Sequence, residues 1–113
     1  MRILVCGSRN FTNGKLLNEI LDKYTITTII EGEARGADTL ARLYGERHGL
    51  DVLPFPALWD KYGRAAGLIR NTQMLVEGKP EHVIAFREPN SRGTQNMINQ
   101  AEKAGIPVTV IEI

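Results

Sequence analysis

The regular alternation of short apolar runs with amphipathic segments constrains the fold of this chain more than any other feature of its sequence. Five runs rich in β-branched residues have the length of strands, at residues 3–7, 27–32, 51–55, 82–86 and 107–113. Their nearly continuous apolarity is typical of strands buried on both faces, as in a parallel sheet. The segments between them carry apolar residues at helical spacing, as at Ala37, Leu40, Ala41 and Tyr44.

This alternation predicts an α/β fold. Right-handed crossovers produce a Rossmann-like open parallel five-stranded sheet with helices on both faces, for which the common strand order is 3-2-1-4-5. A chain of 113 residues is one domain by size, so we expect a single domain over residues 1–113. The helix after the third strand is expected to begin near Asp60, as its N-cap, and to include Met74.

Charge and cysteine content exclude several classes of protein. The formal net charge is +1, so the chain as a whole has no field that would attract nucleic acid or an acidic membrane. The lone cysteine, Cys6, excludes an intramolecular disulfide and favours a reducing compartment. The N-terminal apolar run is too short for a signal peptide or a membrane span. We therefore expect a cytoplasmic protein with no membrane partner and no nucleic-acid partner.

Polar loops gather at one edge of the predicted sheet. Ligands of such sheets bind beyond the carboxyl ends of the strands, where the strand order reverses, here between the first and fourth strands. The loops "GSRNF", "GEARGAD" and "REPNSRGT" follow the first, second and fourth strands, and they carry Arg9, Arg35, Arg87 and Arg92. The planar guanidinium group binds phosphate or carboxylate in a fork geometry. The sequence therefore predicts an anion site at this edge.

Each loop also has an ordinary structural interpretation. Gly7 would let a ligand approach the backbone, or would only form a tight turn. Asp38 would bind a ribose hydroxyl, or would only cap a helix. The amide groups around Gly93 and Thr94 lie at the start of a predicted helix and are the best candidates for phosphate binding. The chain has no G-x-G-x-x-G and no G-K-[ST] motif, so the standard nucleotide motifs are absent.

The stretch "AAGLIRNTQM" places an arginine and an asparagine in a helix that packs on the core. Gly67, Asn71 and Met74 share one face of this helix, and Arg70 borders that face. Glycine there permits the close approach of another backbone or of a ligand. We expect Arg70 and Asn71 to reach the predicted site; the alternative is a structural arginine bonded to backbone carbonyl groups.

Metal and triad chemistry lack the necessary residues. With one cysteine, and with His48 and His82 at the opposite edge of the sheet, no metal site of recognisable spacing and no Ser-His-Asp arrangement is predicted. We expect no metal and no cofactor.

Four motifs, "GSR", "GEARGAD", "AGLIRN" and "SRGTQNMINQA", resemble in order and spacing those of the YspA-like, cpYpsA-related family of the SLOG superfamily, and Trp59-Asp60 also fits. The resemblance covers almost the whole chain. The superfamily includes the DprA/Smf DNA-processing core and the LOG phosphoribohydrolases. The resemblance implies a Rossmann-like fold that binds a nucleotide or a nucleotide-derived signal. The predicted ligand-binding residues are Gly7, Ser8, Arg9, Glu31, Gly32, Arg35, Gly36, Asp38, Trp59, Gly67, Arg70, Asn71, Arg92, Gly93 and Thr94.

The chain departs from the LOG enzymes at their catalytic position. Those enzymes carry P-G-G-x-G-T-x-x-E, and in the matching run "PNSRGTQNM" the glutamate is replaced by Met97. Arg70 matches the arginine of the LOG R-K pair, whereas Asn71 replaces the lysine. The resemblance therefore implies an anion site that is retained and an acid–base group that is lost, and we predict no catalytic residue.

Three functions are compatible with these observations. The favoured one is a non-catalytic binder of a nucleotide derivative, either a sensor or, if the source is a phage, a sponge in the host cytoplasm. The second is a phosphoribohydrolase-like enzyme that acts on nucleoside monophosphates through Glu31 or Glu33. The third is DprA-like binding of single-stranded DNA, which three Phe, three Tyr and one Trp support poorly. The resemblance to dimeric LOG-type domains further implies a homodimer or a larger even oligomer, packed through the helix after the third or the fourth strand.

Overall fold

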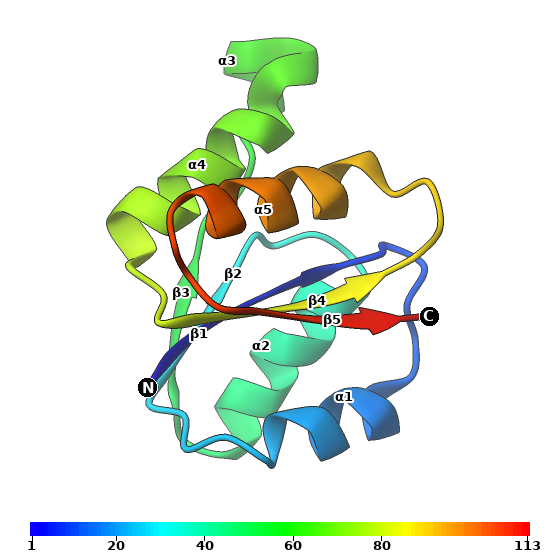
Figure 1. Ribbon diagram of the computed structural model, residues 1–113, viewed down its shortest axis with the longest axis vertical. Coiled ribbons are helices and arrows are strands. Elements are labelled where there is room, and N and C mark those ends of the chain that lie inside the picture. The colour runs from blue at the N-terminus through cyan, green and yellow to red at the C-terminus, as the bar shows by residue number, and fades with distance from the viewer.

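Five parallel strands form the centre of the molecule. The structure is a computed structural model that describes residues 1–113, and its sheet has the order β3-β2-β1-β4-β5. The predicted fold class and strand order are both confirmed (Figure 1). The strands are β1 (Arg2–Gly7), β2 (Thr28–Glu31), β3 (Asp51–Pro54), β4 (His82–Arg87) and β5 (Val108–Glu112).

Helices cover both faces of the sheet, as right-handed crossovers require. Helices α1 (Gly14–Leu21) and α2 (Ala37–Arg47) pack on one face, and α4 (Ala66–Gly78) and α5 (Arg92–Lys103) pack on the other (Figure 1). None of these helices is long and apolar enough to cross a membrane.

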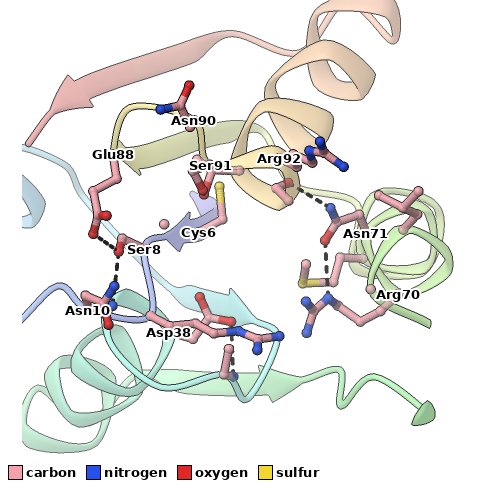
Figure 2. Close-up of a pocket in the computed structure, with 18 of the residues that line it drawn as sticks. Cys6, Ser8, Asn10, Asp38, Arg70, Asn71, Glu88, Asn90, Ser91 and Arg92 are labelled. Carbon is pink, nitrogen blue, oxygen red and sulfur yellow. Dashed lines mark hydrogen bonds between the residues drawn. The ribbon is translucent and has the colours of Figure 1, made fainter. Parts of the chain in front are cut away.

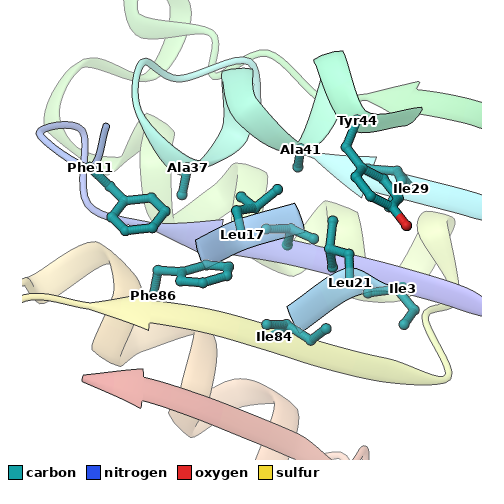
Figure 3. Close-up of a cluster of buried hydrophobic side chains, with 11 residues drawn as sticks. Ile3, Phe11, Leu17, Leu21, Ile29, Ala37, Ala41, Tyr44, Ile84 and Phe86 are labelled. Atoms are coloured by element: carbon teal, nitrogen blue, oxygen red, sulfur yellow. The ribbon is translucent and has the colours of Figure 1, made fainter. Parts of the chain in front are cut away.

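Each face of the sheet has its own hydrophobic core. Ile3 and Val5 of β1 point into the core beneath α1 and α2, which Figure 3 shows, while Leu4 and Cys6 point into the core beneath α4 and α5. Alternate residues of a strand face opposite sides, so two cores explain the continuous apolarity of the central strands. The edge strands β3 and β5 are only partly buried, because each has a neighbour on one side alone.

The helical segment after β3 is interrupted, whereas the sequence predicted one helix that begins near Asp60. A short helix α3 (Trp59–Tyr62) is followed by a 3₁₀ turn, η1 (Gly63–Ala65), and α4 begins only at Ala66. The N-cap of α3 is Leu58, so the predicted N-cap at Asp60 is wrong. Gly63 has a φ angle of +58°, a left-handed conformation that ends the regular helix. As a result α3 projects from the body of the molecule, beyond the start of α4 (Figure 1).

Candidate functional site

A cavity of about 580 Å³ lies at the carboxyl ends of β1 and β4, where the strand order reverses. The loops after β1 and β4 form one side of this central cavity, and α4 forms the opposite side (Figure 2). Its position is the one that the topology predicts for a ligand. Most of the predicted site residues line it, namely Gly7, Ser8, Arg9, Asp38, Trp59, Gly67, Arg70, Asn71, Arg92, Gly93 and Thr94.

The hydroxyl group of Ser8 joins the two loops at one side of the cavity. It donates a hydrogen bond to the carboxylate of Glu88 in the loop after β4, and it accepts one from the amide of Asn10 at 3.0 Å (Figure 2). The backbone amide of Ser8 also donates to the carbonyl of Phe86 at 3.1 Å. Ser8 therefore fixes the spacing of the two loops, and Glu88 is the carboxylate that orients its hydroxyl group.

The first turn of α5 presents free backbone donors. The hydroxyl group of Ser91 is bonded to that of Thr94 at 2.9 Å and caps no amide. The amide groups of Arg92, Gly93 and Thr94 donate to no acceptor in the chain. A Cβ atom built on Gly93 would meet no atom within 4 Å, so the space beside these amides is open. Unpaired amides at a helix N-terminus, together with the helix dipole, form an anion-binding position.

Arg70 combines the two roles that the sequence left open. Its Nη1 donates to the carbonyl of Gly32 at 2.5 Å, and its Nε donates to Oδ1 of Asn71 at 3.2 Å. Its Nη2 has no acceptor in the chain, and Arg70 forms no ion pair, because the two ion pairs of the protein are Arg42–Glu46 and Arg87–Glu112. Burial lowers the pKa of the Arg70 guanidinium, while the neighbouring carboxylate of Asp38 opposes that shift. One part of this guanidinium group is thus structural, and Nη2 is left without a hydrogen-bond acceptor on the lining of the cavity.

Asn71 holds Arg70 and the start of α5 together. Only 4% of it is exposed, and its Nδ2 donates to the carbonyl of Gly93 at 3.2 Å and to Oδ1 of Asn96 at 3.1 Å. Its Oδ1 accepts the bond from Arg70 (Figure 2). All the polar atoms of this side chain are therefore engaged within the protein. Asn71 reaches the cavity, as predicted, but there it positions other groups.

Asp38 closes the loop after β2. Its Oδ2 accepts hydrogen bonds from the amides of Gly32 at 3.0 Å and Ala34 at 3.3 Å, and the N-cap of α2 is Gly36. The interpretation of Asp38 as the helix N-cap is therefore wrong. Its Oδ1 has no hydrogen-bond partner in the chain, although only 5% of the residue is exposed and it lines the cavity. Burial raises the pKa of Asp38 to about 6, against the hydrogen bond from Ala34 and the charge of Arg70.

Some predicted residues lie outside the central cavity. Gly32 and Arg35 line a smaller neighbouring cavity. Gly36 has a φ angle of +77°, and a Cβ atom there would lie 2.2 Å from the carbonyl oxygen of Ser8, so this glycine lets α2 begin against the loop after β1.

Glu31 is fully buried and lines neither cavity. Its Oε1 accepts a bond from the amide of Glu33 at 2.7 Å, and its Oε2 has no partner. Burial, and secondarily the charge of Asp38, raises the pKa of Glu31 to about 7.

The position of the LOG glutamate also lies in the core. Met97 is fully buried, in the same cluster as Cys6 and Met74, and does not line the cavity. Burial raises the pKa of the Cys6 thiol, so this group stays neutral. No group of three or more His, Cys, Asp or Glu side chains is placed to hold a metal ion.

Sequence reasoning missed several residues that line the cavity. Asn10, Asn90 and Ser91 belong to loops that the sequence did identify, so a wider reading of those loops would have included them. Arg64 had no such signal, because it lies in the 3₁₀ turn η1, which the sequence did not predict. The ring of Trp59 lies against the guanidinium of Arg9, whose Cζ is 5.6 Å from the ring centroid.

A parallel sheet of this order with an arginine-rich cavity at its switch point defines a Rossmann-like domain with a candidate anion site. The sequence model of the YspA, cpYpsA-related SLOG family matches residues 1–62, and the chain belongs to this family, as its motifs predicted.

Two similar proteins extend the comparison. The "Gene 61 protein" of Mycobacterium phage D29 is 32% identical over 117 residues, which cover 95% of this chain and 93% of the phage protein. The X-ray structure of DNA processing protein A (DprA) from Streptococcus pneumoniae superposes with a TM-score of 0.76 at 18% identity over 96% of this chain. The chain spans about half of DprA, 49% of its length, and at this identity the likeness shows the fold.

Proposed function

We propose that the chain binds a phosphate-bearing nucleotide derivative in the central cavity and acts as a sensor or as a sequestering protein. The observation that carries the proposal is the pairing of free amides at the start of α5 with guanidinium groups that have no carboxylate partner. The amides of Arg92, Gly93 and Thr94 and the side chains of Arg9 and Arg70 line one cavity. Anions are the ligands that such a set of donors binds.

The free carboxylate oxygen of Asp38 favours a nucleotide over other anionic ligands. A free Oδ1 on a buried carboxylate is an acceptor for hydroxyl groups, and a ribose supplies two of them. Trp59, at the mouth of the cavity, offers an aromatic surface against which a base can stack. Phosphate, sugar and base thus each have a matching group on the lining.

A sequestering role in the host cytoplasm draws support from the phage protein that is 32% identical to this chain. A protein of that kind needs affinity and no turnover. Met97, in the position of the LOG glutamate, is a buried thioether that neither carries charge nor exchanges protons near neutral pH. The binding role is therefore the primary proposal.

One observation favours a phosphoribohydrolase-like activity as the alternative. The pKa of Asp38 is raised to about 6, which is close to the pKa of an efficient general acid or base at neutral pH. Under this alternative Asp38, and not Glu31, activates water beside the ribose, because Glu31 is buried outside the cavity. Free base released from nucleoside monophosphates, and lost in Asp38→Asn, would support the alternative.

We also propose that the chain self-associates. Six large apolar side chains, at Leu58 and in α3 and α4, are exposed. We propose that they form one surface and that a second copy covers it in a homodimer or larger even oligomer. Trp59 and Leu68 belong both to this surface and to the lining of the central cavity. The residues of the surface are Leu58, Trp59, Tyr62, Leu68, Ile69 and Val76.

Isothermal titration calorimetry with AMP and adenosine tests the binding role. We expect AMP to bind and adenosine to bind at least about tenfold more weakly, since it lacks the group that the α5 amides and Arg70 hold. The affinities for a panel of di- and cyclic nucleotides and NAD derivatives then show which kind of nucleotide derivative binds most tightly. Equal affinities for AMP and adenosine would contradict the phosphate site, and the absence of any binding by the folded protein would contradict the proposal as a whole.

A further inference from the structure

A second, smaller cavity of about 310 Å³ lies beside the central one. Gly32, Glu33 and Arg35 of the loop after β2 line this side cavity on one side, and the segment between β3 and α3 lines it on the other. Its volume is at the lower end of the range of roughly 300–1,000 Å³ that ligand pockets occupy. The side cavity is therefore large enough to receive part of a ligand.

The two cavities share one wall. Arg9, Trp59 and Arg70 line both of them. Arg9 packs its guanidinium on the ring of Trp59, and Arg70 bonds through Nη1 to the carbonyl of Gly32, a residue of the side cavity. A ligand that extends from one cavity into the other must pass these two guanidinium groups.

Both cavities carry excess positive charge. Arg9, Arg35 and Arg70 line the side cavity, none of them forms an ion pair, and Glu33 is the single carboxylate on its lining. Arg64 and Arg92 add further cationic groups to the central cavity alone. Because Arg64 and Arg92 belong to the central cavity alone and Arg35 belongs to the side cavity alone, each cavity fits an anionic group of its own.

We propose that the ligand is a nucleotide derivative with two separate phosphate-bearing parts, of the size of a dinucleotide. One phosphate lies on the amides of α5 in the central cavity, the other lies against Arg35 in the side cavity, and the link between them passes Arg9 and Arg70. This inference rests on the proposed function and adds the class of ligand. It makes Arg35, which does not touch the central cavity, a residue that selects the longer ligand.

Calorimetry with two defined probes tests the inference. The probes are AMP, which has one phosphate, and the 5′-phosphorylated adenylyl dinucleotide pApA, which has two. We expect pApA to bind at least about tenfold more tightly than AMP. The Arg35→Ala substitution should weaken the affinity for pApA by about tenfold and leave the affinity for AMP unchanged. Arg47→Ala is the matched control, because Arg47 is exposed on α2 and lines neither cavity, and it should change neither affinity.

Three other outcomes would each contradict a specific part of the inference or of the proposed function. If pApA and AMP bind equally and Arg35→Ala affects neither, the two-phosphate ligand is wrong while the proposed function survives. If neither probe binds to the folded protein, the proposed function fails and this inference fails with it. If affinity keeps rising from pApA to a ten-nucleotide strand, the site follows a nucleic acid, and the dinucleotide-sized ligand is wrong.

Discussion

Replacing Glu31 by glutamine should flatten the pH dependence of stability. The Glu31 side chain is fully buried, its Oε2 has no partner, and its pKa is raised from the ordinary value of 4.5 to about 7. The folded protein thus holds the proton more tightly than the unfolded chain does. The stability that this provides is complete below pH 4.5 and is lost as the pH rises to about 7.

The size of the effect follows from the shift. One pKa unit corresponds to about 1.4 kcal/mol, so the change at Glu31 costs on the order of 3 kcal/mol of unfolding free energy by pH 8. Asp38 adds a loss of the same sign at lower pH, because its pKa is raised from 3.8 to about 6. In Glu31→Gln the Asp38 contribution remains, together with an opposite contribution from His82, whose pKa is lowered by burial.

Urea unfolding at a series of pH values between 4 and 8, followed by circular dichroism, measures this difference. The change of the unfolding free energy with pH is the quantity to compare, because the buried amide in Glu31→Gln adds a free-energy cost that does not depend on pH. We expect the wild-type free energy of unfolding to fall by about 3 kcal/mol more than that of Glu31→Gln across the series. Parallel pH profiles for the two proteins would refute the reasoning.

Further predictions concern Arg70, Met97 and assembly. Arg70→Ala should weaken AMP binding by roughly ten- to a hundredfold in calorimetry, and it should also lower the free energy of unfolding by about 1–2 kcal/mol, because the bond to the Gly32 carbonyl is lost; unchanged affinity would mean that the arginine is structural alone. Met97→Glu should destabilise the protein by several kcal/mol in urea unfolding and should release no free base, because it buries a carboxylate in the core; a stable variant with turnover would contradict this placement. Light scattering at micromolar concentration should give at least twice the monomer mass of 12.6 kDa, and Leu68→Glu should reduce the mass to that of the monomer; a monomeric wild type would contradict the assembly.

The elements of the sheet could be predicted because their signals are local. Runs of β-branched residues and helical spacing lie within a few neighbouring positions, and the handedness of crossovers then restricts the topology. The same reasoning brought the loops of Arg9, Asp38 and Gly93 to one edge, where the structure has them on one cavity. The carboxyl ends of parallel strands lie at one edge of the sheet, so the loops that follow them lie close together regardless of which side chains they carry.

The roles of individual side chains could not be predicted in the same way. Ser8 and Asn71 were expected to serve a ligand, yet their polar atoms bond Glu88, Gly93 and Asn96, which are distant in the sequence. The direction of Glu31 depends on the register of β2, since a shift of one residue would turn it toward the other face. The helix break at Gly63 depends on a backbone angle, and a glycine within a helical pattern leaves that angle open.

The central claim is that a phosphate group lies on the amides of Arg92, Gly93 and Thr94. Gly93→Asp tests it most directly, because a Cβ atom at this position would meet no atom within 4 Å and an aspartate there adds a negative charge to the first turn of α5. An acidic residue in the first turn of a helix is favourable by roughly 0.3–1 kcal/mol, so the variant should be as stable as the wild type or slightly more so. Calorimetry with AMP should then show binding to the wild type and a loss of at least about a hundredfold in the variant. A folded Gly93→Asp protein that binds AMP as tightly as the wild type would contradict the account.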